Sequence, residues 1–203
     1  MHAQLTRIAD CAEVLPGYAL KARAEHEPEG THQVIMGKHL AQHIDQGLLY
    51  RYLPEHELRI TPRGSLEKYR VREGDVLFVS RGSHNCAAVV ESVPDPTVAS
   101  ATFYILRPRN GIDSAYLAWC LNQPPTQARI AQVRTGAGTP IIQRRIFAEL
   151  TLPVPPLDHQ RKLAELAKLM TKERILRQAL VQQTDRLHRA LGEKLLQQMT
   201  PEN

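Results

Sequence analysis

The chain contains few aromatic residues, few cysteines and no long apolar run. Only 5% of its 203 residues are Phe, Trp or Tyr, so the stacking platforms of single-strand binders are not indicated. The three cysteines, Cys11, Cys86 and Cys120, include no CxxC pair, which predicts small buried apolar residues instead of a disulfide framework. No apolar run approaches the roughly 20 residues of a membrane span. The N-terminus lacks a secretion signal, so we expect a cytoplasmic protein with no membrane partner.

Motifs for catalysis or metal binding are also missing. The sequence has no P-loop, no GxGxxG and no HExxH. His39 and His43 stand four residues apart, as two ligands on one helix face would, but no third ligand follows nearby. We therefore interpret them as solvated side chains, and we predict no catalytic residue, no metal and no cofactor in this chain.

The charge balance is modestly basic. The formal net charge is +5 and the isoelectric point is about 9.3. This excess suits a polyanionic partner but does not by itself identify one, so the position of the arginines matters more than their number.

The sequence divides into two parts near residue 156. The first part consists of short apolar runs broken by Gly, Pro, Asp and Asn, and predicts buried strands over 76–80, 86–92 and 101–108. Helical spacing then appears over 113–123 and about 126–133. Weaker strand signals lie at 5–8 and 34–36. The expected fold of this part is α+β with a compact, curled sheet.

The second part predicts one long helix from Asp158 to about Met199. Leucines recur there in a heptad pattern that polar residues interrupt at Glu173, Gln183 and Lys194. The helix would be roughly 60 Å long and would need a partner helix to cover its leucines. Folding back on the first part, or a break near 171–172 that makes a helical hairpin, are the alternatives. The expected partner-helix residues are Leu166, Leu169, Leu176, Leu180 and Leu187.

Two loops of the first part carry side chains that suit nucleic acid. One follows a predicted buried strand and the other lies between predicted helices. Arg, His, Ser, Asn and Gln side chains grip phosphates or read base edges, and glycine permits close backbone approach. The first loop consists of Arg81, Gly82, Ser83, His84 and Asn85. The second supplies Thr135, Gly136, Thr139, Gln143 and Arg144, with Lys38 and Arg23 as weaker candidates elsewhere.

Each loop also has a simpler interpretation. Gly, Ser and Asn are common in polar hairpin turns that join two core strands, which would explain residues 81–85. The small residues of 134–140 would equally suit a flexible linker between two helices. The residues alone do not decide between these interpretations and a contact surface.

The order of these features resembles a known family. They are similar to those of the specificity subunit of type I restriction–modification systems. The stretches that carry the resemblance are, in order, "GDVLFVSRGS", "ATFYILRP", the "YLAWCLN" helix, "TGAGTPIIQRRIFAELTLPVPPL" and "DHQRKLAEL". The resemblance implies a DNA target recognition domain over 1–153 and a proline joint over 154–157. It also implies one long helix over 158–200, which acts as a spacer and dimerises as a coiled coil.

The resemblance also implies partners. Members of this family usually carry two recognition domains and two spacer helices in one chain of about twice this size. A single set of each, between Met1 and a "TPEN" ending that looks like a natural terminus, implies a half-subunit, and a fragment of a longer subunit is the alternative. Two copies would pair their helices antiparallel as a homodimer and read a bipartite palindrome.

The family's other partners are duplex DNA, the adenine methyltransferase (M) subunit and, through it, the restriction (R) subunit. The chain itself would have no catalysis, and S-adenosylmethionine would belong to the methyltransferase. A coiled-coil adaptor whose globular part binds protein without DNA specificity is the alternative, and a stand-alone nuclease comes third.

Overall fold

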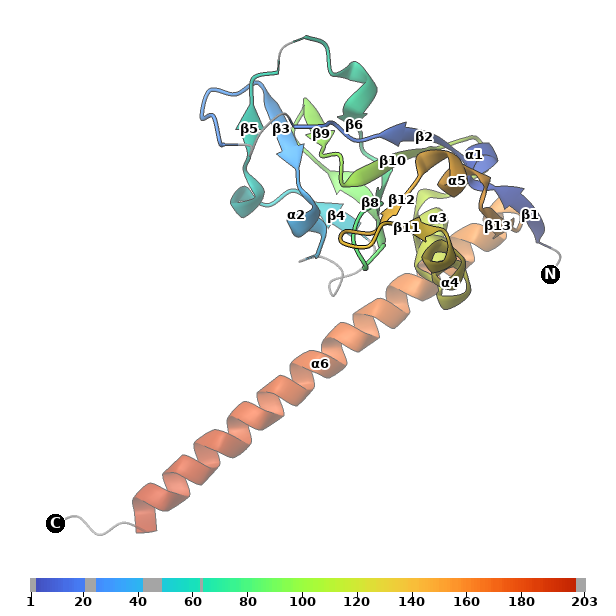
Figure 1. Ribbon diagram of the computed structural model, residues 1–203. Coiled ribbons are helices and arrows are strands. Elements are labelled where there is room, and N and C mark those ends of the chain that lie inside the picture. Colours follow the sequence, from blue (N-terminus) through green and yellow to red (C-terminus); the bar gives the residue numbers. More distant parts are fainter. Residues whose placement is uncertain (1–2, 21–24, 42–48, 63, 200–203) are drawn as a thin grey trace.

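The computed structural model describes residues 3–20, 25–41, 49–62 and 64–199 (Figure 1). The α-helices are α1 (Ile8–Cys11), α2 (Gly37–Ala41), α3 (Ser114–Asn122), α4 (Pro124–Gln132), α5 (Arg144–Glu149) and α6 (Leu157–Met199). The 3-10 helices are η2 (Pro54–His56) and η3 (Glu67–Tyr69). The strands are β1 (Gln4–Arg7), β2 (Ala12–Pro16), β3 (His32–Ile35), β4 (Leu49–Arg51), β5 (Arg59–Ile60), β6 (Arg70–Val71), β7 (Val76–Val79), β8 (Ala87–Ser92), β9 (Thr97–Ala99), β10 (Phe103–Pro108), β11 (Arg134–Thr135), β12 (Ile141–Ile142) and β13 (Thr151–Val154).

A five-stranded sheet in the order β2-β10-β7-β8-β4 forms the centre of the head, the part of the molecule that precedes α6. Its middle strand β7 reads Val-Leu-Phe-Val and is buried on both faces, as a continuous apolar run requires. The β4–β8 pair is parallel, whereas the other pairs of this sheet are antiparallel. A smaller sheet in the order β5-β3-β9-β6 lies beside it.

Apolar side chains fill both faces of the central sheet. One cluster joins it to the smaller sheet and includes Ile35, Tyr50, Leu77 and Phe103. The other face is covered by α1, α3, α4 and α5, where the rings of Phe78 and Phe147 stack with centroids 4.3 Å apart. The head is therefore a curled α+β unit, which confirms the predicted fold class.

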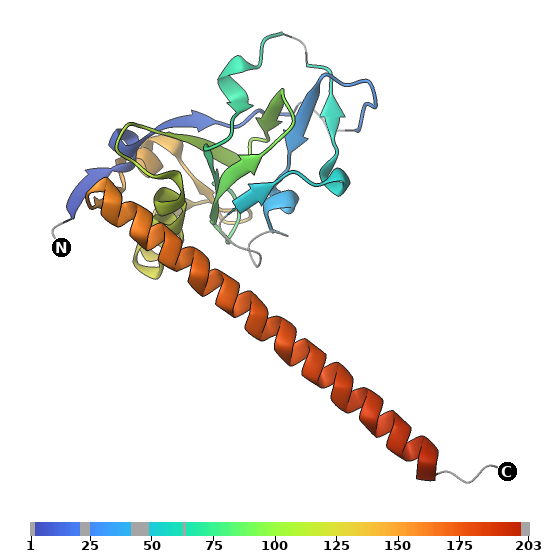
Figure 2. The same cartoon turned by 180° about the vertical axis from the view of Figure 1, so that it is seen from behind.

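The long helix α6 begins against the head and then leaves it. Its first turns contribute Leu163 and Ala164 to the core cluster, and Ala167 is 5% exposed. Side chains after Ile175 are exposed as far as residue 199. Figure 2 shows the start of α6 lying beside the N-terminal strand and the rest running free of the head. The helix continues without a break at 171–172, so the helical-hairpin alternative is wrong.

The joint between head and helix is short and well bonded. The strand β13 ends at Val154, so Pro155 and Pro156 form the connection to α6. Gln160, which is 1% exposed, accepts a hydrogen bond from the Asp113 N–H at 2.9 Å. Its amide Nε2 donates to the carbonyl oxygens of Gly111 and Pro155, both at 2.9 Å. Two of these bonds tie the first turn of α6 to the loop before α3, and the third ties it to Pro155 of the joint.

Most elements with a strong local pattern were predicted within one or two residues of their observed bounds. The strands expected over 76–80, 86–92 and 101–108 are β7, β8 and β10, and Asp113 caps α3 by accepting the Tyr116 N–H at 2.9 Å. Among the elements that the sequence did not indicate is β2, which is a strand because it pairs with β10 about 90 residues later. The residues 134–142 form the hairpin β11–β12 and are not a plain linker.

The cysteines have the predicted role of small apolar residues. Cys11 and Cys120 are buried, Cys86 is half-buried, and all three thiols are free. Burial raises the pKa of the Cys11 and Cys86 thiols to about 11, so both are protonated at neutral pH. Within the described ranges, no helix has both the length and the apolarity that a membrane crossing needs.

Candidate nucleic-acid interface

The two loops singled out in the sequence meet in space. The Gly82 N–H donates to the Pro140 carbonyl oxygen at 2.7 Å, and the Ile142 N–H donates to the Ser80 carbonyl oxygen at 3.0 Å. Arg81 and Ile141 form an antiparallel bridge between the two segments. Residues about 60 positions apart therefore share one short backbone ladder, which holds the loop 80–85 against the hairpin β11–β12.

Asn85 connects these two segments through hydrogen bonds of its side chain. Its side-chain Nδ2 donates to the Val79 carbonyl oxygen at 2.9 Å, and its Oδ1 accepts from the Arg134 Nε at 2.7 Å. The Gln127 Nε2 donates to the backbone oxygen of Asn85 at 2.7 Å. Asn85 is only 3% exposed, so its amide is committed to the protein. The structure therefore gives Asn85 a positioning role and leaves no free amide group for a base edge.

Two predicted arginines, Arg81 and Arg144, affect the pKa of the Tyr104 hydroxyl. That hydroxyl donates to the Ile142 carbonyl oxygen at 2.5 Å. Burial raises the pKa of Tyr104, and the nearby positive charges of Arg144 and Arg81 oppose that rise. The Arg81 Nε donates to the Ala101 carbonyl oxygen at 3.1 Å, and the Arg144 Nη1 donates to the Val14 carbonyl oxygen at 3.0 Å. Both guanidinium groups thus have a fixed anchor and an exposed side.

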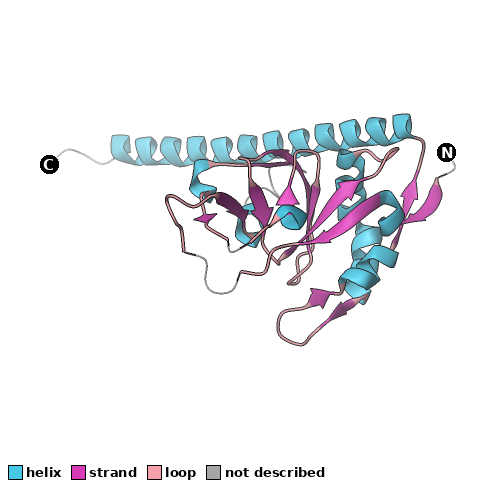
Figure 3. Ribbon diagram, turned by 90° about the horizontal axis from the view of Figure 1, so that it is seen from above, coloured by secondary structure: helices cyan, strands magenta, loops and turns pink. Residues whose placement is uncertain are grey.

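The tips of both segments are open to solvent. Ser83 and His84 are exposed at one tip, and Thr135, Gly136 and Thr139 are exposed at the other. Gln143 and Arg144 are exposed at the start of α5. Figure 3 shows the β11–β12 hairpin projecting from the head on the side away from α6. The loop Ser80–Asn85 and the hairpin, with Gln143 and Arg144, are called the loop pair below.

Glycines shape the loop pair. Gly82 has φ +90° and Gly136 has φ +103°, a left-handed conformation that side chains other than glycine rarely adopt. At Gly82 a Cβ would meet no atom within 4 Å, so a ligand backbone could approach there.

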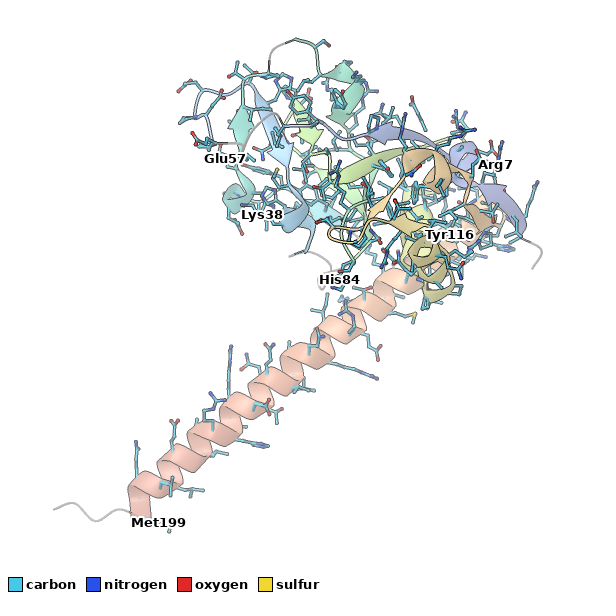
Figure 4. All side chains as sticks on the ribbon, viewed as in Figure 1. Arg7, Lys38, Glu57, His84, Tyr116 and Met199 are labelled. Carbon is cyan, nitrogen blue, oxygen red and sulfur yellow. The ribbon has the colours of Figure 1, made fainter. Side chains whose placement is uncertain are left out.

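Lys38 lies on α2, outside the loop pair but close to it. It lines a hollow of about 490 Å³ whose wall also includes Arg81, Glu55 and Glu57. Figure 4 shows Lys38 and His84 on different elements along the lower edge of the head. Arg23, the other isolated candidate, lies outside the described residues, as does His43.

His39 does not have the environment that the sequence indicated. It is 3% exposed, and its ring stacks on His56 with centroids 4.6 Å apart, so the expectation of a solvated side chain was wrong. Among the residues that the structure describes, no group of three or more His, Cys, Asp or Glu side chains is arranged to hold a metal ion.

The predicted partner-helix leucines share one exposed stripe on α6. Their exposures are 53% for Leu166, 56% for Leu169, 60% for Leu176, 68% for Leu180 and 57% for Leu187. Leu169, Leu176 and Leu180 also line one shallow depression along the helix surface. The stripe therefore offers apolar surface that no described part of the head covers.

Sequence reasoning missed the residues that position the loop pair and the joint with α6. Gln127, Arg134 and Gln160 bond to backbone or side chains of distant segments. Gln160 had a local signal, because a glutamine near a helix start directly after a proline joint can reach back to free backbone groups. Gln127 and Arg134 had none, because their partner Asn85 is more than 40 residues away.

Comparison with known proteins gives consistent results. The chain is 23% identical over 164 residues to the MjaVIII type I restriction enzyme specificity subunit of Methanocaldococcus jannaschii, covering 80% of this chain and 34% of that protein. Its fold is similar to the HsdS subunit from Thermoanaerobacter tengcongensis, with a TM-score of 0.64, 17% identity, and coverage of 94% of this chain and 44% of that one. It is also similar to a type I S subunit from M. genitalium, with a TM-score of 0.54, 14% identity, and coverage of 83% and 39%.

The chain thus spans about a third of the curated relative and less than half of these two solved subunits. The two structural matches show a shared fold, which includes the head and a long C-terminal helix. Residues 3–179 match the family described as the type I restriction modification DNA specificity domain. Since that match covers most of the chain, the protein belongs to this family.

Proposed function

We propose that this chain reads duplex DNA sequence for a type I restriction–modification complex and has no catalysis of its own. The observation that carries the proposal is the loop pair, in which two segments rich in Arg, Ser, Thr and Gln are held together as one exposed surface. Arginine side chains anchored on one side and free on the other suit phosphates and guanine edges. Family membership supplies the biological setting.

The proposal extends to partners. The exposed leucine stripe of α6 supports pairing with a second copy, so that the chain acts as a half-subunit of a homodimer. Two heads related by a twofold axis would then read a bipartite palindrome. A methyltransferase subunit, and through it a restriction subunit, would supply the chemistry, with S-adenosylmethionine bound by the methyltransferase and not by this chain.

A duplex-binding assay tests the reading function. Sequences bound by the protein are first selected from a random duplex library, and affinity is then measured by fluorescence anisotropy at several salt concentrations. Arg81→Ala and Arg144→Ala should each weaken binding by about 1–3 kcal/mol. Arg189→Ala, which removes the same charge from an exposed position on α6, is the matched control and should leave affinity unchanged.

The pattern of losses separates base from phosphate contacts. Relaxed preference at one position of the site would mark a base contact, whereas a uniform loss with a smaller salt slope would mark a phosphate contact. If replacing Arg81, Ser83, His84 and Arg144 together by alanine left affinity and sequence preference intact in a folded protein, the loop pair would not be the DNA surface. If the unchanged protein selected no duplex sequence from the library, the coiled-coil adaptor would be the better interpretation.

A further inference from the structure

The leucine stripe of α6 lies on the side of the helix opposite to the head. Gln160 and Ala167 are buried against the head, and Thr171 and Ile175 are half-buried on the same side. With 3.6 residues per turn, Leu166, Leu169, Leu176, Leu180 and Leu187 fall roughly half a turn away from that side. The helix of a second copy can therefore lie along the stripe without contacting the head of the first copy.

The outer part of this stripe, together with Glu173, Leu191 and Lys194 on the same side of the helix, is arranged symmetrically about one point. Leu180 and Leu187 lie at equal distances on either side of the Gln183–Thr184 bond, and so do Leu176 and Leu191. Glu173 and Lys194 form the next such pair, with opposite charges. Leu191 is 48% exposed and Lys194 is exposed. When the helix of a second copy runs in the opposite direction, leucine faces leucine and Glu173 faces Lys194. A parallel helix does not give both matches.

We propose that the antiparallel helices of two copies pair in one register, with the twofold axis passing between Gln183 and Thr184. This inference rests on the proposed homodimer with antiparallel helices and specifies its register. Leu180 and Leu176 then pack on Leu187 and Leu191 of the partner subunit. Glu173 faces Lys194 of the partner subunit, and the symmetry makes this ion pair twice.

The polar interruptions of the heptad pattern have a function in this arrangement. A polar residue in an otherwise apolar seam selects one register, because other alignments bury it against an apolar or like-charged neighbour. Glu173 already bonds Arg177 on its own helix at 2.7 Å, and that pair is exposed. Pairing adds Lys194 of the partner subunit on the other side of the Glu173 carboxylate.

Competing alignments bring like charges together. An antiparallel pair centred near Gln178 also matches leucine with leucine, but it places Lys162 beside Lys194 of the partner subunit and Arg177 beside its own copy. A parallel pair places Glu173 and Lys194 each beside its own copy. Like charges juxtaposed in an interface disfavour both alternatives. In the proposed register the two helix starts are about 80 Å apart along the axis, against about 60 Å in the competing antiparallel one.

Charge reversal tests the register. Glu173→Lys places lysine against lysine in both ion pairs of its homodimer, and Lys194→Glu places glutamate against glutamate. Each variant alone should dimerise at least about tenfold more weakly than the unchanged protein, and an equimolar mixture of the two should recover dimers. The masses are measured by sedimentation without DNA. Arg189→Glu and Glu193→Lys, which reverse charges on the side of α6 away from the stripe, are the matched controls and should not change the mass.

Cysteine cross-linking gives a second, independent measurement. Gln183→Cys lies next to its own copy across the axis, within the roughly 6 Å between Cα atoms that a disulfide allows, so it should form a covalent dimer under mild oxidation. Arg177→Cys lies about 20 Å from its copy along the axis and should not. The native cysteines are buried or half-buried and compete little.

The outcomes separate this inference from the proposed function. Cross-linking at 177 instead of 183, no recovery on mixing, or a monomeric unchanged protein would each overturn the proposed register. A protein that binds selected DNA through the loop pair but stays monomeric would overturn the pairing alone. A protein that pairs as proposed but shows no DNA binding would overturn the reading function alone.

Discussion

At the scale of single residues, two buried amide side chains connect segments that are far apart in the sequence. Asn85 links the loop after β7 to Arg134 at the start of the hairpin. Gln160 links the first turn of α6 to Gly111 and Asp113 before α3. An amide suits both places because it donates and accepts at once, so one side chain satisfies backbone groups of both kinds.

Replacing Gln160 should therefore destabilise the head as well as the joint. Gln160→Leu leaves the Asp113 N–H and the carbonyl oxygens of Gly111 and Pro155 without their partner, which we expect to cost about 2–4 kcal/mol of unfolding free energy. Chemical denaturation measures this loss. Gln178→Leu, an exposed glutamine of the same helix, is the matched control. Equal stability of the two variants would contradict a role for Gln160 at the joint.

At the scale of elements, the hairpin β11–β12 owes its position to the loop beside it and not to its own length. Each of its strands has two residues, which is too short for independent stability. The Ile142 N–H bond to Ser80 and the Gly82 N–H bond to Pro140 extend the ladder across the loop pair. The turn between the strands depends on the positive φ of Gly136.

A pair of glycine variants tests that dependence. Gly136→Ala forces a Cβ into a left-handed conformation, which costs about 1–2 kcal/mol, so the hairpin should open more often. The expected readout is faster hydrogen exchange at the Ile142 and Gly82 N–H groups, together with weaker DNA binding. Gly138→Ala, where a Cβ meets no atom within 4 Å, is the control and should leave exchange unchanged. Identical exchange in the two variants would show that Gly136 is not needed for the turn.

At the scale of the whole molecule, the proposed function gives separate tasks to the head and to the outer part of α6. The first turns of α6 belong to the core of the head, whereas Met199 lies far from the head (Figure 4). If the proposed function holds, the head alone can bind one half-site. High affinity for both half-sites then depends on pairing through the exposed half of the helix.

Disrupting the leucine stripe should separate these two tasks. Leu176→Asp combined with Leu180→Asp places carboxylates in the proposed interface, so the protein should become monomeric by sedimentation. Affinity for an isolated half-site should stay within about twofold, while affinity for the bipartite site should fall about 100-fold or more through lost avidity. Gln178→Asp with Gln182→Asp, on the other side of the helix, controls for added charge. Unchanged affinity for the bipartite site in the monomeric variant would argue against paired reading.

Local patterns were sufficient for a large part of the fold. The apolar runs of β7, β8 and β10, the helical spacing of α3 and the uninterrupted α6 depend on neighbours in the chain, so they were predicted close to their observed bounds. The edge strand β2 and the parallel partners β3 and β9 were weak or absent in the sequence. They exist because distant strands offer them hydrogen bonds, and no local period records that.

The candidate site likewise has features that the local sequence predicted and features that it did not. Residue types alone indicated both loops, because Arg, Ser, Thr and Gly in exposed positions are what phosphates and bases require. Periodicity alone located the leucine stripe. Only the tertiary structure decided that the loops meet, that Asn85 is buried and connects them, and that the stripe faces away from the head. The reason is physical: residue chemistry and helical period are local properties, whereas a contact between residues 81 and 141 exists only once the sheet between them has folded.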